Sequence, residues 1–201
     1  MTETQIFRLL AAHVPEAAVD YCYNLWEVHK FIFKVKAKRA TKLGDYKYNP
    51  SDKSHKITVN NDLNNYSFLI TYLHEVAHLI TYKQFGRKVL PHGTEWKSNF
   101  KSITLPMMTT AVFPDDVLRK LANYIKNPKA SSCNDHHLMK ALNAYEENDS
   151  TFLSDVAIGA AFKLGARAFK KESLRRTRFV CLEISTGRKY LISRTALVEL
   201  I

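Results

Sequence analysis

The first part of the chain changes from a helical to a strand-like pattern of apolar residues. Residues 2–12 and 16–29 show apolar side chains every three or four positions, which predicts two amphipathic helices separated at Pro15. Over residues 31–38 the period shortens, and apolar side chains alternate with lysines. This alternation predicts a strand with one solvent-facing side.

Two more strands are predicted over residues 44–50 and 55–60, because the segment between them is rich in turn-forming residues. We therefore expect a short antiparallel meander of three strands. If residues 55–60 form its edge, an extended substrate peptide would bind there mainly through backbone hydrogen bonds.

The longest helical pattern follows these strands. NDLNNYSFLITYLHEVAHLITYKQFG places its apolar residues on one face and ends at Gly86, a residue type that commonly follows the last helical turn. Three further helices are predicted: one after His92-Gly93 that ends before Pro106, one over about 115–126, and one over about 135–146.

From about residue 150 onward the pattern is typical of short strands, with a hairpin turn at Ser185-Thr186-Gly187. This segment is also strongly basic, since ten Lys or Arg residues lie between 163 and 194 against two glutamates. The sequence thus predicts an α+β protein with a domain over 1–148 and a small, basic, β-rich module over 150–201.

The composition favours a soluble protein with an anionic partner. The 201 residues carry a formal net charge of +11, which favours nucleic acid first and an acidic membrane surface second, although a basic protein without such a partner fits equally well. Three widely spaced cysteines provide no disulfide framework, and no secretory signal or bilayer-length apolar run is present. We expect a cytoplasmic protein, nucleoid-associated if it binds DNA, and a monomer by default.

The segment HEVAH carries the candidate chemistry. On a helix, His74 and His78 lie one turn apart on the same face, so both imidazoles can bind one zinc ion. Glu75 is rotated by about 100° and stands beside the ion. There it can accept a proton from a water whose pKa zinc lowers to about 7.

A catalytic zinc site requires a third protein ligand and an open position. His92 is the preferred candidate, because the loop after Gly86 is long enough to return the chain to the ion and Gly93 permits close approach of the backbone. Glu95 is the alternative, and Asp62 or another upstream carboxylate is a third option without support from spacing.

These residues resemble the active site of the SprT-like metallopeptidases, the family that includes the Spartan protease. HEVAHLITYKQFG and PHGTEW match its pattern of HExxH, a variable loop, a His-Gly pair and an aromatic, here Trp96. The resemblance covers about residues 10–105. It implies a zincin-like fold, one catalytic Zn²⁺ held by His74, His78 and His92, Glu75 as the catalytic residue, and substrates that are bound or crosslinked to DNA.

The C-terminal module departs from that family. Many bacterial members end in a zinc ribbon with four cysteines, whereas this region has Cys181 alone, with Cys133 upstream, and adding His136 and His137 does not complete a site. We expect both cysteines to be apolar packing residues. We also expect this module to bind DNA, with a tentative set of phosphate contacts: Lys170, Lys171, Arg175, Arg176 and Arg178. Phe169, Phe179 and Tyr190 either stack on bases or form the core.

Three functions therefore compete. The favoured one is a zinc endopeptidase that acts on DNA-associated proteins. The second is a nucleic-acid-binding protein whose zinc site is structural or inactive, and the third is a metal-dependent hydrolase of a small substrate. A structural site has no use for Glu75 and would normally complete four protein ligands, which favours the first function.

Overall fold

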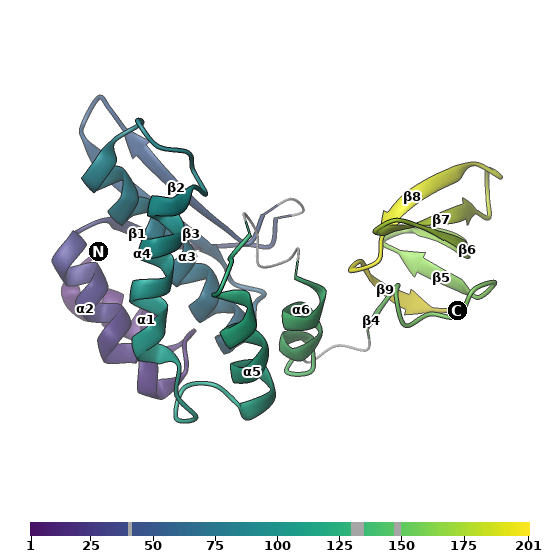
Figure 1. Cartoon of the computed structure of the whole chain (residues 1–201), viewed down its shortest axis with the longest axis horizontal. Helices are drawn as coiled ribbons and strands as arrows, with labels where there is room; N and C mark the ends of the chain where they lie inside the picture. Colours follow the sequence, from purple (N-terminus) through teal and green to yellow (C-terminus); the bar gives the residue numbers. More distant parts are fainter. Residues whose placement is uncertain (40–41, 130–134, 147–149) are drawn as a thin grey trace. The chain divides into compact units, whose positions relative to one another are not determined.

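A computed structural model describes residues 1–39, 42–129, 135–146 and 150–201 (Figure 1). These residues form two compact units, Met1–Glu146 and Glu147–Ile201. The first combines helices with a small sheet and the second is built of strands, so the protein has the mixed α+β class that its sequence predicts. Among the described helices, none has the length and apolar character needed to cross a lipid bilayer.

The first unit begins with the two predicted helices. α1 (Glu3–Ala11) starts at a capping box, in which the Thr2 hydroxyl accepts from the Gln5 backbone and the Gln5 side chain accepts from the Thr2 backbone. A short 3₁₀ turn, η1 (Glu16–Ala18), follows Pro15 and leads into α2 (Val19–His29). The apolar sides of both helices are buried in the core.

The first sheet contains β1 (Ile32–Lys36), β2 (Gly44–Asn49) and β3 (Ser54–Asn60) in the order β1-β3-β2. β3 is antiparallel to β2 but parallel to β1. The predicted antiparallel meander is therefore wrong, because the chain crosses the sheet after β1 and β3 then inserts between the other two strands. Residues 55–60 do not form an edge; the edge strands are β1 and β2.

The long predicted helix is α3 (Asn65–Phe85). The Asn64 side chain accepts from the Ser67 backbone at 2.9 Å and caps its first turn, and Gly86 ends it with a φ of 62°. α3 lies against β2 and β3 and against α4 (Thr94–Thr104). Because its middle contacts both layers, most of its side chains there are buried.

The remaining helices of this unit are short. They are η2 (Leu105–Met107), α5 (Asp115–Tyr124) and α6 (His136–Asn143). The predicted helices over about 115–126 and 135–146 are confirmed, with no end shifted by more than three residues. α5 and α6 contact each other and add Leu121 and Leu138 to the core.

The second unit is an antiparallel sheet in the order β4-β9-β5-β6-β7-β8. Its strands are β4 (Thr151–Phe152), β5 (Ala161–Leu164), β6 (Arg167–Arg175), β7 (Arg178–Glu183), β8 (Lys189–Ser193) and β9 (Leu197–Leu200). Phe162, Phe169, Phe179 and Cys181 belong to its small core. Cys181 is thus the apolar packing residue that the sequence predicts, whereas Cys133 lies outside the described residues.

One predicted phosphate contact is buried inside this unit. Lys171 is only 2% exposed, and its ammonium donates to the carbonyl oxygens of Leu153 at 2.7 Å and Val156 at 2.5 Å. It also lies 3.6 Å from the centre of the Phe179 ring. Lys171 is therefore a structural cation, and its place in the predicted DNA-contact set is wrong because its charge already has partners within the fold.

Lys171→Ala is expected to destabilise the second unit by about 2–4 kcal/mol, because buried carbonyl oxygens lose a charged donor. Hydrogen–deuterium exchange of peptides from residues 150–201 measures this effect in the full chain. The matched control is Lys170→Ala, which removes the same charge from an exposed neighbour. Equal exchange in the two variants would contradict the structural role of Lys171.

Candidate metal centre

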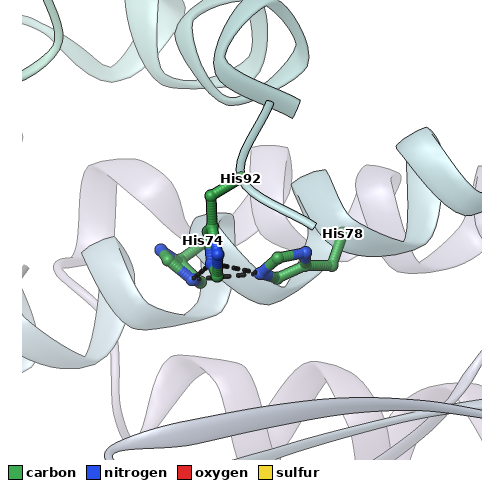
Figure 2. Close-up of side chains that lie close together, drawn as sticks. All are labelled: His74, His78 and His92. Atoms are coloured by element: carbon green, nitrogen blue, oxygen red, sulfur yellow. Dashed lines mark hydrogen bonds between the residues drawn. The ribbon is translucent and has the colours of Figure 1, made fainter. Parts of the chain in front are cut away.

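Three imidazole rings meet beside the middle of α3 (Figure 2). His74 and His78 come from successive turns of the helix, and their Nε2 atoms lie 3.2 Å apart. His92 comes from the loop between α3 and α4, and its Nε2 lies 3.0 Å from that of His78 and 3.4 Å from that of His74. The structure thus brings together the three residues that the sequence singles out as ligands.

This arrangement fits a divalent cation. A tetrahedral zinc about 2.0–2.1 Å from each ligand nitrogen separates those nitrogens by about 3.3–3.4 Å, close to the distances observed here. Within the described residues, the cluster of candidate ligands consists of His74, His78 and His92. The alternatives, Glu95 and Asp62, do not belong to it, and Asp62 pairs instead with Lys38 at 3.5 Å.

The surroundings keep the three rings neutral. Burial, reinforced by His78 and His92, lowers the pKa of His74 to about 3. Burial and the neighbouring His92 lower the pKa of His78 to about 3, and burial alone lowers the pKa of His92. Neutral imidazole is the form that binds a metal ion, so the donor set is ready for a cation near pH 7.

Trp96 of α4 holds the rings in place. Its indole is fully buried, and its centre lies 4.7 Å from that of His74, 5.3 Å from that of His78 and 4.8 Å from that of His92. Its ring also stacks on that of Phe100, with 5.2 Å between the ring centres. One rigid side chain therefore restricts the orientation of all three candidate ligands.

Glu75 lies next to His74 and is enclosed by the start of β2. A Cβ atom on Gly44 would approach the Glu75 Oε1 to 2.6 Å and the Thr71 methyl group to 2.7 Å, so glycine is needed for this contact. The backbone N–H of Tyr46 donates to the Glu75 carboxylate. Burial, followed by the nearby Asp45, raises the pKa of Glu75 to about 8. Burial thus favours the neutral carboxyl, and a cation held by the neighbouring histidines would favour the carboxylate form that can act as a base.

A cavity of about 690 Å³ opens over Glu75 and the three histidines. β2 contributes Gly44, Asp45 and Tyr46 to its wall, α3 contributes Thr81 and Tyr82, and the following loop contributes Arg87 and residues 89–91. Its volume is that of a typical ligand site. The other tyrosine near the motif, Tyr72, is buried in the core and donates to the Cys22 carbonyl at 2.8 Å.

Sequence reasoning missed Gly44 and Tyr46 as parts of this site. Tyr46 stacks nearly parallel to His78 at 6.5 Å between ring centres, and its hydroxyl lies 2.9 Å from the Nδ1 of His55. No signal in the sequence indicates that this strand lies over Glu75. Trp96 was visible as an aromatic after the His-Gly pair, but its contacts with all three rings come from the fold.

The remaining predicted DNA contacts lie on the second unit. Lys170, Arg175, Arg176 and Arg178 are exposed, the last three at the turn that joins β6 to β7. Phe169 and Phe179 are buried in the core, so they are not free to stack on bases. Tyr190 is partly buried and packs against the same core.

Comparison with known proteins identifies the family. A model of the SprT-like family matches residues 13–115, which is just over half of the chain and includes His74, Glu75, His78 and His92. The chain belongs to the SprT-like family. The resemblance read from the HExxH segment is thereby confirmed.

Individual relatives of this SprT-like chain are similar to it over a shorter region than the family model covers. It is 38% identical over 66 residues to Protein SprT of Escherichia coli O157:H7, which covers 32% of this chain and 37% of that protein. It is 42% identical over 66 residues to Protein SprT of Cronobacter sakazakii, with the same coverage. The chain thus spans little more than a third of the length of these relatives. No solved structure matches this SprT-like chain.

Proposed function

We propose that this SprT-like protein is a zinc-dependent endopeptidase with a zincin-like first domain. The observation that carries the proposal is the convergence of three Nε2 atoms to within 3.0–3.4 Å beside the buried Glu75, at the floor of an open cavity. Three nitrogen ligands leave one position of a tetrahedral ion free, which is the pattern of catalytic sites.

His74, His78 and His92 would hold the ion, and the domain 1–148 would contain the complete centre. When bound, zinc supplies a Lewis acid that polarises a peptide carbonyl and acidifies water. Glu75 would accept the proton of the attacking water and pass it to the leaving amine. Its burial and its bond from the Tyr46 amide fix the carboxylate in one position.

The sheet suggests how a polypeptide would bind. β2 is an edge strand, and its residues Gly44 to Tyr46 line the cavity. An extended peptide can pair with such an edge through backbone hydrogen bonds, which do not depend on side-chain identity. This favours flexible or unfolded protein segments as substrates and disfavours the small-molecule hydrolase.

The basic second unit supports substrates that are bound or crosslinked to DNA. Exposed Lys170, Arg175, Arg176 and Arg178 provide cations for phosphate contacts, and the module over 150–201 would concentrate the enzyme on DNA. The alternative is a nucleic-acid-binding protein whose zinc is structural or inactive. This alternative also explains the basic surface of the second unit, but it gives no role to Glu75 or to the cavity.

The proposal is tested on the purified full chain. We expect about one zinc per chain by elemental analysis, and cleavage of a denatured, DNA-binding model protein that stops after chelation and returns when zinc is added. Magnesium added in place of zinc is the control, because it prefers oxygen ligands to imidazole. A zinc-loaded protein that cleaves neither DNA-bound nor denatured protein would favour the alternative.

A further inference from the structure

The first unit has a second concave surface, on the side of the sheet that faces away from α3. Its cavity of about 230 Å³ is lined by Asp45 and Thr58 and by five cationic residues. We call these five the cationic sheet face: Lys36, Arg39, Lys42, Lys47 and Lys56. They come from all three strands and from the segment between β1 and β2.

Strand alternation explains why these cations share one side. Val35 and Ile57 pack against the core on the side of α3, so their neighbours Lys36 and Lys56 project from the opposite side of the sheet. In β2, Tyr46 faces the metal-centre cavity, and Lys47 follows it on the outer side. The register then places Lys47 directly opposite Lys56.

This pairing is unfavourable without an anion. Like charges directly opposite on neighbouring strands destabilise a sheet. Asp45 offsets part of the charge, since its carboxylate lies 2.8 Å from the Lys42 ammonium and 3.7 Å from that of Lys47. Within the described ranges, no carboxylate pairs with Lys36, Arg39 or Lys56, so a surplus of positive charge remains.

Arg39 is held in place by neutral groups. Its Nε donates to the Asn60 side-chain oxygen at 2.7 Å and its Nη1 donates to the Thr58 hydroxyl at 3.0 Å. Both acceptors are buried. These contacts orient the guanidinium without neutralising it, which leaves a fixed cation at the cavity.

We propose that the cationic sheet face binds the phosphate backbone of a nucleic acid strand. A single phosphate could not contact cations that are distributed over three β-strands. The regularly spaced phosphates of a nucleic acid backbone could contact several of them. Tyr46 and Lys47 are adjacent on β2 but face opposite sides of the sheet. A nucleic acid bound at Lys47 would therefore be separated from the cavity over Glu75 by the sheet alone. Nucleic acid binding here requires no metal ion, but its use in presenting DNA-bound proteins for cleavage rests on the proposed function.

The test compares two triple variants of the full chain that lose equal charge. Lys36→Gln/Lys47→Gln/Lys56→Gln removes three of the five cations of the cationic sheet face. It keeps Lys42, which pairs with Asp45, and Arg39, whose bonds connect the loop to β3. Lys101→Gln/Lys120→Gln/Lys126→Gln removes three exposed lysines of the helical part of the same unit. Fluorescence anisotropy measures binding of a labelled single strand of ~20 nucleotides and of a duplex, over about 50–200 mM salt. Thermal melting verifies that each variant is folded.

We expect the sheet-face variant to bind at least about tenfold more weakly and to lose about two to three units of the salt slope for one or both nucleic acids. The helix variant should stay within about threefold of the parent. Equal losses in the two variants would overturn the proposal. An unchanged affinity of the sheet-face variant for nucleic acid would also overturn it. If that variant instead lost only its binding to phosphatidylglycerol vesicles, the face would be a membrane site and the proposal would be wrong. Displacement of DNA by inorganic phosphate beyond the effect of chloride at matched ionic strength would instead indicate a site for free phosphate.

Discussion

Glu75→Gln is expected to lower the rate of protein cleavage by about 10²–10⁴-fold while leaving the zinc content unchanged. Glutamine has nearly the same shape, and its side-chain oxygen can accept the hydrogen bond from the Tyr46 N–H, but it cannot take a proton from water at neutral pH. Initial rates on a denatured, DNA-bound protein and zinc stoichiometry on the same preparation measure both effects.

Glu95→Gln is the matched control for this change. Glu95 lies near the metal centre, in the first turn of α4, but outside the cluster of candidate ligands. It should retain parent-like cleavage. Full activity in Glu75→Gln would remove the proposed general base, whereas loss of zinc in that variant would mean that the carboxylate acts as a ligand.

His92→Ala is expected to weaken zinc binding by at least about 100-fold, because only two imidazoles from α3 would remain to hold the ion. The effect should be large because the loop that carries His92 supplies the only ligand from outside the helix within the described cluster. Competition with a chromogenic zinc chelator measures the affinity directly.

The same titration with Glu95→Gln distinguishes between the two third-ligand candidates considered from the sequence. Parent-like zinc affinity in Glu95→Gln together with a loss in His92→Ala supports the histidine. The reverse result would contradict the assignment, even though the His92 ring is directed at the other two in Figure 2.

Much of the candidate site could be predicted because helical spacing is local information. The four-residue interval between His74 and His78 determines that both rings share one face of α3, and the Gly86 stop shows where the loop toward His92 begins. Gly44 and Tyr46 could not be predicted, because their contact with Glu75 depends on which strand lies over α3.

The sheet shows the same division between local and long-range information. Alternation in residues 31–38 correctly predicts that Phe31 and Phe33 are buried and Val35 partly buried, whereas Ala37, beyond the end of β1, is exposed. The pattern does not indicate the neighbouring strand. The insertion of β3 between β1 and β2 depends on tertiary packing, so the meander was a reasonable but wrong expectation. Strand positions were thus predictable, and strand order was not.

A local signal indicates that Lys171 is buried, although the basic composition of its segment favours a surface role. Phe169 and Lys171 are two residues apart in β6, so strand alternation places both on the inner side. In the structure, the carbonyl oxygens of Leu153 and Val156 explain how a lysine can occupy a core position.

The burial of Lys171 beside exposed Lys170 gives the second unit an internal chemical reporter. Acylating reagents attack a free amine, so they modify Lys170 in the native protein and reach Lys171 only when the sheet opens. The ratio of labelling at these adjacent positions, read from one peptide by mass spectrometry, therefore follows opening of this unit with its own built-in reference.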